Sequence, residues 1–318
     1  MISSEVIIVG GGPAGSTCAW KLKQNGIDCI VLDKRTFPRT KLCAGWITPQ
    51  VLKNLELYTK QYPHSLTSFN KLHFHVCGKR LGLKTRQYAI RRGEFDNWLL
   101  ERAGVPVHHH EVHAITRDGE YYIIDNEYRC RHLVGAGGTN CPVYRAVFTD
   151  DHPRAEDSLI VSMEEEFTYD YRDDRCHLWF FENKLPGYSW YVPKQNGFVN
   201  IGIGGVAPTL KTRGKTIKDH WYLFVEKLRN LSLVCNRTFN PRGHTYYLRQ
   251  KHIVGQKKGC YIVGDAVGLA TKDLGEGIGP AIQSGILAAD AITNKTNYSL
   301  KSVPAYSLPR MILSRFAS

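Results

Sequence analysis

Glycines with the spacing of a phosphate-binding turn lie near the start of this 318-residue sequence. They follow a β-branched run at 6–9, precede a helical pattern, and comprise Gly10, Gly12, Pro13, Ala14 and Gly15. In such a strand–turn–helix unit the first glycine permits the tight turn, and the second lets the backbone approach a pyrophosphate. The third lets the helix pack close to the strand. The pattern predicts a dinucleotide site at the start of a helix.

An acidic residue stands where this fingerprint requires one. A second apolar run, residues 29–32, ends at Asp33, roughly 20 residues past the glycines. A carboxylate at this place accepts hydrogen bonds from a ribose hydroxyl. These residues predict a nucleotide cofactor and leave both NAD and FAD open.

A second glycine-rich stretch occupies residues 259–292, near the other end of the chain. An apolar run ends there at Gly264 and Asp265, and a helical pattern starts near Gly277, just after Gly275. We expect Asp265 to bind ribityl hydroxyls and the two later glycines to let backbone N–H groups approach a flavin ring. The helix would direct its positive end at the pyrimidine side of the ring, where reduction places negative charge. Two such elements predict one elongated cofactor, FAD.

Four segments together resemble one family of flavoenzymes. DKRTFPRTKLCAGWITP (33–49) is similar to a Lys-x-Cys-Gly-Gly segment, and YAIRRGEFDNWLLERAG (88–104) to an Arg-x-x-Phe-Asp helix. LPGYSWYVPKQNGFVNIGIGG (185–205) is similar to a Tyr-x-Trp-x-Phe-Pro strand, and residues 264–285 to a Gly-Asp motif. The motifs resemble, in order, those of FAD oxidoreductases of the p-hydroxybenzoate hydroxylase fold, specifically the geranylgeranyl reductase family.

The resemblance implies roles for individual residues. It places Cys43 beside the flavin ring, where the thiol either donates a proton or only shapes the pocket. A buried, unreactive thiol is the alternative, because burial raises the pKa of a thiol. Tyr188 and Trp190 share one face of a strand and would line an apolar substrate cavity, or else belong to the core. The residues expected to bind FAD are Gly10, Gly12, Pro13, Ala14, Gly15, Asp33, Lys34, Arg35, Cys43, Ala44, Arg92, Gly264, Asp265, Gly275, Gly277 and Ile278.

Three features depart from the family pattern. Gly137 stands in the run Gly-Ala-Gly-Gly at 135–138, where the family usually has Asp, and this disfavours direct use of NAD(P)H. Ala44 replaces the first glycine after the cysteine. The chain also stops soon after the Gly-Asp helix, so we expect a substrate site that is shorter or more open than in relatives.

The expected fold class is α/β, a Rossmann-like FAD-binding domain of the p-hydroxybenzoate hydroxylase type with an inserted antiparallel-sheet substrate domain. Residues 72–84 alternate as antiparallel strands do, and strand-like runs within 159–205 precede a helix at about 216–230. The FAD-binding domain is expected to comprise 1–67, 88–150 and 245–293. The substrate domain would comprise 68–87 and 151–244, and 294–318 would form a C-terminal tail, either loose or lying on the surface.

Charge and cysteine usage limit the class of protein. The net charge of +13 is spread along the whole chain, which argues against a nucleic-acid partner. A basic face toward an anionic membrane surface or an acidic partner explains this charge, and so does a merely soluble basic surface. The nine scattered cysteines include no C-x-x-C pair and indicate neither a disulfide framework nor a structural zinc site. Without a long apolar run or a signal-peptide pattern, we expect a cytoplasmic protein, with peripheral contact at a membrane as an option.

Two clusters of titratable residues stand out in the sequence. His108, His109, His110 and His113 have no carboxylate or cysteine at ligand spacing, so a solvated strand is favoured and no metal is expected. The acidic run MEEEF at 163–167 predicts a strand with an outward acidic face rather than a catalytic carboxylate pair.

The favoured function is FAD-dependent reduction of carbon–carbon double bonds in an isoprenoid or similar apolar small molecule. An aromatic monooxygenase or halogenase on the same fold is the first alternative. An electron-transfer flavoprotein without its own small substrate is the second. Because no second G-x-G-x-x-G follows a strand, electrons are expected from transiently bound NAD(P)H or from a donor protein such as reduced ferredoxin, which the basic charge would suit.

Overall fold

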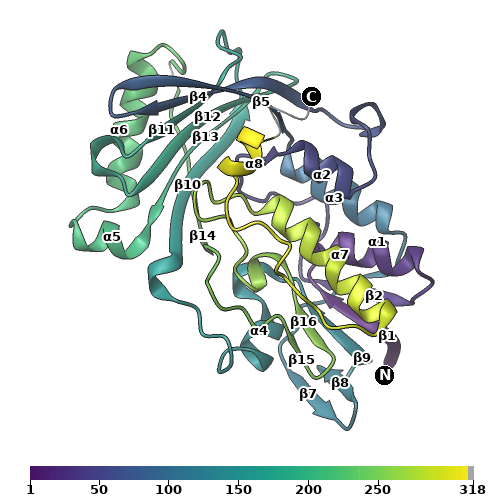
Figure 1. Cartoon of the computed structure of the whole chain (residues 1–318). Helices are drawn as coiled ribbons and strands as arrows, with labels where there is room; N and C mark the ends of the chain where they lie inside the picture. The colour runs from purple at the N-terminus through teal and green to yellow at the C-terminus, as the bar shows by residue number, and fades with distance from the viewer. Residues whose placement is uncertain (236, 314–318) are drawn as a thin grey trace. The chain divides into compact units, whose positions relative to one another are not determined.

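The computed structural model describes residues 1–235 and 237–313, which fold into two compact units (Figure 1). The first unit comprises residues 1–40, 93–155 and 247–307. The second comprises the described residues of 41–92, 156–246 and 308–313. Residues 41–67 and 88–92, which the sequence assigned to the FAD-binding domain, lie in the second unit.

A mainly parallel sheet forms the centre of the first unit. Its strands are β1 (Ile2–Val9), β2 (Cys29–Asp33), β6 (Val107–His109), β7 (Ile115–Asp118), β8 (Tyr121–Ile124), β9 (Tyr128–Gly135), β15 (Gln256–Lys257) and β16 (Cys260–Ile262). They lie in the order β15-β16-β9-β1-β2-β6, with β8 pairing β9 and β7 pairing β8. β1 is parallel to both β2 and β9, and β9 is parallel to β16. The loops after β1 and β16 therefore emerge at the same edge of the sheet.

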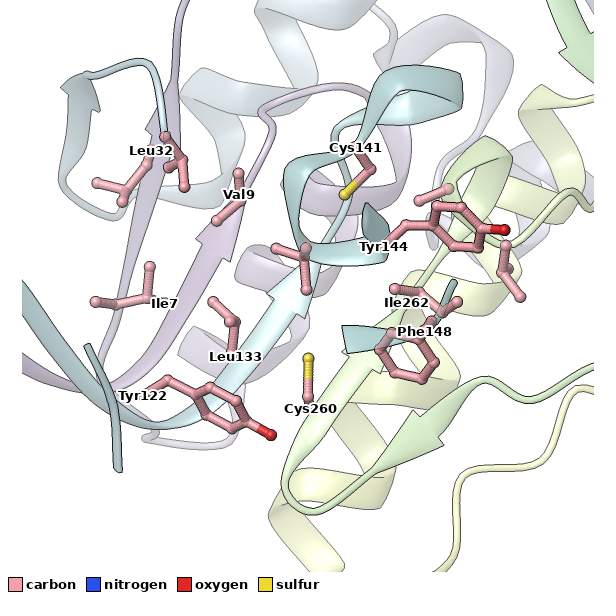
Figure 2. Packing of buried hydrophobic residues seen from close by; sticks show 14 of the residues in the cluster. Ile7, Val9, Leu32, Tyr122, Leu133, Cys141, Tyr144, Phe148, Cys260 and Ile262 are labelled. Atoms are coloured by element: carbon pink, nitrogen blue, oxygen red, sulfur yellow. The ribbon is translucent and has the colours of Figure 1, made fainter. Parts of the chain in front are cut away.

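The side chains of β1 alternate between two apolar clusters, one on each face of the sheet. Ile7 and Val9 point into a cluster that includes Leu32, Leu133 and Cys260 (Figure 2). Val6 and Ile8 point into the other cluster, which is built with helices α1 (Pro13–Gln24) and α7 (Ile278–Asn294). Because both faces are covered, a continuous β-branched run forms this strand, as expected for a parallel sheet.

Helices α1 and α7 come from opposite ends of the chain and pack side by side (Figure 1). Gly285 of α7 makes this possible, because a Cβ added there would lie only 2.3 Å from the carbonyl oxygen of Ala14. A glycine at such a crossing lets two backbones approach within a distance that no side chain permits. The remaining helices of this unit are α3 (Arg92–Ala103), whose first residue belongs to the second unit, and α4 (Pro142–Val147).

The second unit contains a mostly antiparallel sheet. Its strands are β3 (Trp46–Ile47), β4 (Thr67–Val76), β5 (Lys79–Ala89), β10 (Leu159–Thr168), β11 (Cys176–Phe180), β12 (Gly187–Lys194), β13 (Phe198–Val206) and β14 (Arg242–Tyr247). The order is β14-β10-β13-β12-β11-β4-β5-β3. The hairpin expected at 72–84 is present as β4 and β5, and the pair β11–β4 is parallel because a long connection separates these two strands.

One face of this second sheet is covered by helices α5 (Ala207–Thr212) and α6 (Ile217–Asn230). Trp221, Phe224 and Leu228 recur on one side of α6 and pack on the sheet together with Ile201 and Ile203 of β13. Thr216 and Asp219 form a capping box at the start of α6. Since side chains alternate along a strand, Gly202 and Gly204 of β13 face the other way.

Part of the segment expected as a C-terminal tail packs into the first unit. Leu300 and Val303 are buried there, Tyr298 is partly buried, and the Tyr298 hydroxyl donates to the carbonyl oxygen of Ile262 at 3.2 Å. Helix α8 (Leu308–Leu313) follows, and residues 314–318 lie outside the described residues.

The last of the helices is the short α2 (Pro49–Asn54), which belongs to the second unit. None of the helices described is both long and apolar enough to cross a lipid bilayer.

Candidate functional site

The turn between β1 and α1 has the geometry that its glycines predict. Gly10 has a φ of +113°, and a Cβ added there would lie 2.4 Å from the carbonyl oxygen of Ala136. A Cβ at Gly15 would lie 1.9 Å from the carbonyl oxygen of Gly10. At Gly12 an added Cβ would meet only Arg39 Nη2, at 3.3 Å. Gly10 and Gly15 are thus required by the turn itself, and Gly12 leaves the start of α1 without a covering side chain.

Helix α1 begins with Pro13 and has no side-chain cap. The free N–H groups of its first turn are therefore available to bind an anion. The positive end of the helix dipole lies at the same place and favours negative charge there. Arg39 adds a cation beside Gly12 and lies 3.4 Å from Asp96. These features fit the pyrophosphate of FAD. The sequence reasoning did not single out Arg39, although the residue stands within the 33–49 motif.

Asp33 is tied to the glycine turn. Its Oδ2 accepts a hydrogen bond from the Gly11 N–H at 2.7 Å, and its Oδ1 accepts one from the Arg35 N–H at 2.8 Å. The carboxylate is largely buried, and its remaining lone pairs suit a ribose hydroxyl. Lys34 instead makes an exposed ion pair with Glu111 at 2.8 Å.

The second glycine-rich element lies against the first. Gly264 follows β16 with a φ of +60°, and a Cβ added there would lie 3.1 Å from Ala14 Cβ and 3.3 Å from Ala281 Cβ. The start of α7 at Ile278 follows Gly277 and also lacks a side-chain cap. A Cβ added at Gly277 would lie 3.3 Å from Asp265 Oδ1, so the Asp265 carboxylate lies beside this helix start. The first unit thereby brings together the two elements that the sequence assigned to FAD.

The loop between Asp265 and α7 is held by the chain after α7. Asp273 accepts hydrogen bonds from the N–H groups of Leu274, at 2.9 Å, and Ser307, at 2.9 Å. The Ser307 hydroxyl donates to Glu276 at 2.8 Å and lies 2.8 Å from the Thr271 hydroxyl. Gly275, with a φ of +63°, stands between these anchors.

The turn at Gly137 packs tightly where the side chain of another residue would stand. A Cβ added at Gly137 would lie 3.1 Å from Cys141 Cα and 3.3 Å from Pro142 Cδ. An aspartate at this position would therefore crowd the start of α4. Arg154 donates to the carbonyl oxygens of Thr139 and, at 3.0 Å, of Ala266, and so connects this turn to the Gly264–Ala266 turn.

In the second unit, Cys43 lies in a sharp turn. Its Sγ accepts a hydrogen bond from the Gly45 N–H at 3.4 Å, and the side chain is half-buried. Gly45 has a φ of +72°, and a Cβ added there would lie 2.0 Å from the carbonyl oxygen of Ile90 and 2.8 Å from Lys194 Nζ. Ala44 occupies the intervening position of the turn. Arg92, two residues after Ile90, is buried.

A chain of hydrogen bonds joins this turn to the aromatic strand. Asn200 Nδ2 donates to the Cys43 carbonyl oxygen at 3.4 Å, and Trp190 Nε1 donates to Asn200 Oδ1 at 2.7 Å. The rings of Tyr188 and Trp190 lie 5.7 Å apart, and Tyr188 stacks on Phe180 at 5.0 Å. These aromatic residues occupy the face of the sheet opposite α6.

The expectation of an outward acidic face on residues 163–167 is wrong. The strand forms as β10, but Glu164 is only 3% exposed. Glu165 lies on the other face and pairs with Arg237 at 2.5 Å. Glu166 pairs with Lys194 at 2.5 Å and with Arg91 at 3.0 Å. The reason is that both faces of this strand are covered, and cationic residues from other segments surround two of the three carboxylates.

The histidines near β6 are engaged with separate neighbours. His108 Nδ1 lies 3.1 Å from the Tyr128 hydroxyl, and His109 Nε2 lies 3.0 Å from the Lys34 carbonyl oxygen. His110 Nε2 lies 2.7 Å from Asp125 Oδ2. Within residues 1–235 and 237–313, no group of three or more His, Cys, Asp or Glu side chains is arranged to hold a metal ion.

Comparisons with known proteins agree with this geometry. The sequence profile described as "FAD dependent oxidoreductase" matches residues 5–93. An uncharacterized protein of Methanosarcina barkeri is 31% identical over 91% of this chain and 74% of its own length. The menaquinone reductase of Mycobacterium tuberculosis is 26% identical over 92% of this chain and 77% of its own. The geranylgeranyl diphosphate reductase of Rhodobacter capsulatus is 25% identical over 90% and 74%, respectively.

A solved structure shares the fold along the entire chain. It is a geranylgeranyl bacteriochlorophyll reductase-like protein from Thermoplasma acidophilum, with a TM-score of 0.81 and 20% identity, covering 100% of this chain and 83% of that one. The paired glycine turns, the fold and the relatives all indicate an FAD-dependent oxidoreductase. The chain belongs to the geranylgeranyl reductase family of FAD-dependent oxidoreductases.

Proposed function

We propose that this protein reduces carbon–carbon double bonds in an isoprenoid or similar apolar substrate. The observation that carries the proposal is the connection, within the second unit, from the Cys43 turn through Asn200 to Trp190. It links the cysteine motif to an aromatic face suited to a flat, apolar chain. The names of two relatives support this, because menaquinone and geranylgeranyl diphosphate both carry polyprenyl chains.

The residues divide between cofactor and substrate. Within the first unit, FAD would be held by the turn at Gly10–Gly15, by Asp33 and Arg35, and by the second turn with Asp265, Gly275, Gly277 and Ile278. When bound and reduced, FAD supplies a hydride. Tyr188 and Trp190 would line the substrate site, and Cys43 would donate a proton or shape the pocket.

The source of electrons belongs to the same proposal. Reduced ferredoxin or another acidic donor protein suits the net charge of +13, and transiently bound NAD(P)H is the alternative. Gly137 supports the first of these, because the aspartate usual in the family is missing there and would crowd the start of α4. The same charge would favour peripheral contact with an anionic membrane that holds an apolar substrate.

An anaerobic reaction tests the proposed function. Enzyme reduced with dithionite is mixed with a polyprenyl lipid, and flavin reoxidation is followed by absorbance while the product is weighed by mass spectrometry. We expect reoxidation without oxygen and a product heavier by two hydrogens. Cys43→Ser should retain FAD and turn over more slowly.

Two other results would contradict the proposal. If reoxidation requires oxygen and the product gains an oxygen atom, the protein is a monooxygenase. If the reduced flavin passes electrons only to a protein acceptor, it is an electron-transfer flavoprotein.

A further inference from the structure

Glu164 shares a cross-strand row with a glycine and an aromatic residue of the proposed substrate face. Glu164 of β10 is registered with Gly202 of β13, which is registered with Trp190 of β12. A Cβ added at Gly202 would lie 2.2 Å from Trp190 Cζ2 and 2.7 Å from Glu164 Cβ. The absence of a side chain at Gly202 therefore lets the indole ring and the Glu164 side chain both approach this position on β13, the strand between them.

The Glu164 carboxyl is buried without a partner for one of its oxygens. Within the described part of the chain, no hydrogen-bond donor reaches Glu164 Oε2. A buried carboxylate in that position would lose its hydration without a replacement, and this cost is several times that of burying a neutral acid. The neutral, protonated form is therefore favoured.

Charges from several elements act on this carboxyl. Burial and the neighbouring carboxylate of Glu166 raise the pKa of Glu164, whereas Lys194 of β12, Lys41 before β3 and Arg92 at the start of α3 lower it. Burial is the largest cause, and the resulting pKa is about 7. Of these cations, Lys41 has its Nζ 2.7 Å from His244 Nε2.

The next two glutamates show what pairing does on the same strand. Glu166 is bonded to Lys194 and Arg91, and these cations hold the pKa of its carboxyl below the ordinary value. Glu165 is paired with Arg237 on the opposite face. Of the three, only Glu164 combines burial with an unpartnered oxygen on the face that carries Trp190. Adjacent carboxyls held in different protonation states are a common arrangement for acid–base chemistry.

We propose that Glu164 is the acid that donates the proton when the substrate double bond is reduced. The inference rests on the function proposed above. When bound and reduced, FAD would supply the hydride, and with it both electrons, to one carbon of the double bond. The O–H bond of Glu164 breaks and a C–H bond forms at the other carbon, leaving the Glu164 carboxylate. Lys194, Lys41 and Arg92 stabilise that carboxylate until water returns a proton, and Cys43 then shapes the pocket.

Single-turnover kinetics test this role. Full-length, FAD-loaded enzyme is reduced anaerobically with dithionite and mixed with a polyprenyl lipid across a range of pH. Loss of a general acid costs about 10²–10⁴-fold in rate, so Glu164→Gln should reoxidise at least about 100-fold more slowly than wild type. Glu164→Asp should recover part of the rate. Glu165→Gln, the matched change on the other face, should behave as wild type. The wild-type rate should fall as pH rises through about 7, and the Glu164→Gln rate should not.

A second readout needs neither substrate nor turnover. In infrared spectra of the oxidised wild-type protein, the band of a protonated carboxyl should disappear as pH rises through neutrality, and Glu164→Gln should lack this band. Absence of such a band in wild type overturns the proposal, and so does an unchanged reoxidation rate in Glu164→Gln when wild type is active. A wild type that does not reoxidise with any polyprenyl lipid overturns the proposed function first, and the role of Glu164 falls with it.

Discussion

Asp265 and Asp273 flank the same glycine loop but hold different groups. Asp265 lies beside the start of α7, and Asp273 anchors Ser307 and Leu274. We therefore expect Asp265→Ala to weaken FAD binding, since a carboxylate-to-hydroxyl hydrogen bond is worth about 1.5–3 kcal/mol, with little loss of stability in the apoprotein. Asp273→Ala should lower apoprotein stability instead. Flavin fluorescence titration and thermal unfolding of both apoproteins check this, and equal FAD affinities would contradict it.

The protonation of Glu164 also predicts how stability depends on pH. Burial raises its pKa from 4.5 to about 7 in the folded protein, so the folded state keeps a proton that the unfolded chain releases. The stability that the protonated Glu164 carboxyl contributes to the folded state is therefore complete below about pH 4.5 and is lost as pH rises through about 7. Relative to Glu164→Gln, wild type should lose on the order of 3 kcal/mol in free energy of unfolding across this window. Urea denaturation of both proteins at several pH values measures the difference, and a constant difference would refute the raised pKa.

Two glycines of β13 make a matched test at the scale of the strand. Gly202 lies under the Trp190 ring, whereas a Cβ added at Gly204 would find its nearest neighbours at 3.7 and 3.8 Å, which is ordinary contact. Gly202→Ala should therefore cost about 1–3 kcal/mol of stability, because the indole must move. Gly204→Ala should be neutral or stabilising by up to about 1 kcal/mol. Denaturant unfolding of the two variants checks this, and equal stabilities would show that the indole shifts at no cost.

Local sequence patterns predict the elements of this fold but not all of their contacts. The turn at Gly10–Gly15, the hairpin within 72–84 and the helix near 216–230 follow from glycine spacing, alternation and capping residues. The burial of Glu164 does not follow, because three successive glutamates look solvent-exposed unless the covered second face and Gly202 are known. The bond between Asp273 and Ser307 spans 34 residues and leaves no local signal.

At the scale of the whole molecule, distant parts of the chain converge on each site. In the first unit, Gly285 brings α7 against α1, so two glycine turns more than 250 residues apart can serve one cofactor. In the second unit, Asn200 of β13 joins the Cys43 turn to Trp190 of β12, and about 150 residues separate that turn from this hairpin. Such convergence lets each unit position its chemistry on strand ends and a sheet face rather than on a single motif.

The net charge makes a prediction about the electron donor. With +13 on the chain, association with an acidic protein should be accelerated by long-range attraction, and salt should weaken that attraction because the Debye length is only about 8 Å at roughly 0.15 M. Anaerobic stopped-flow bleaching of the flavin by reduced ferredoxin should therefore slow as ionic strength rises. Reduction by NADPH should be slow at every salt concentration, since the turn at Gly137 lacks the usual aspartate. Fast reduction by NADPH together with a salt-independent ferredoxin rate would show that the charge serves some other partner, and that a pyridine nucleotide is the donor.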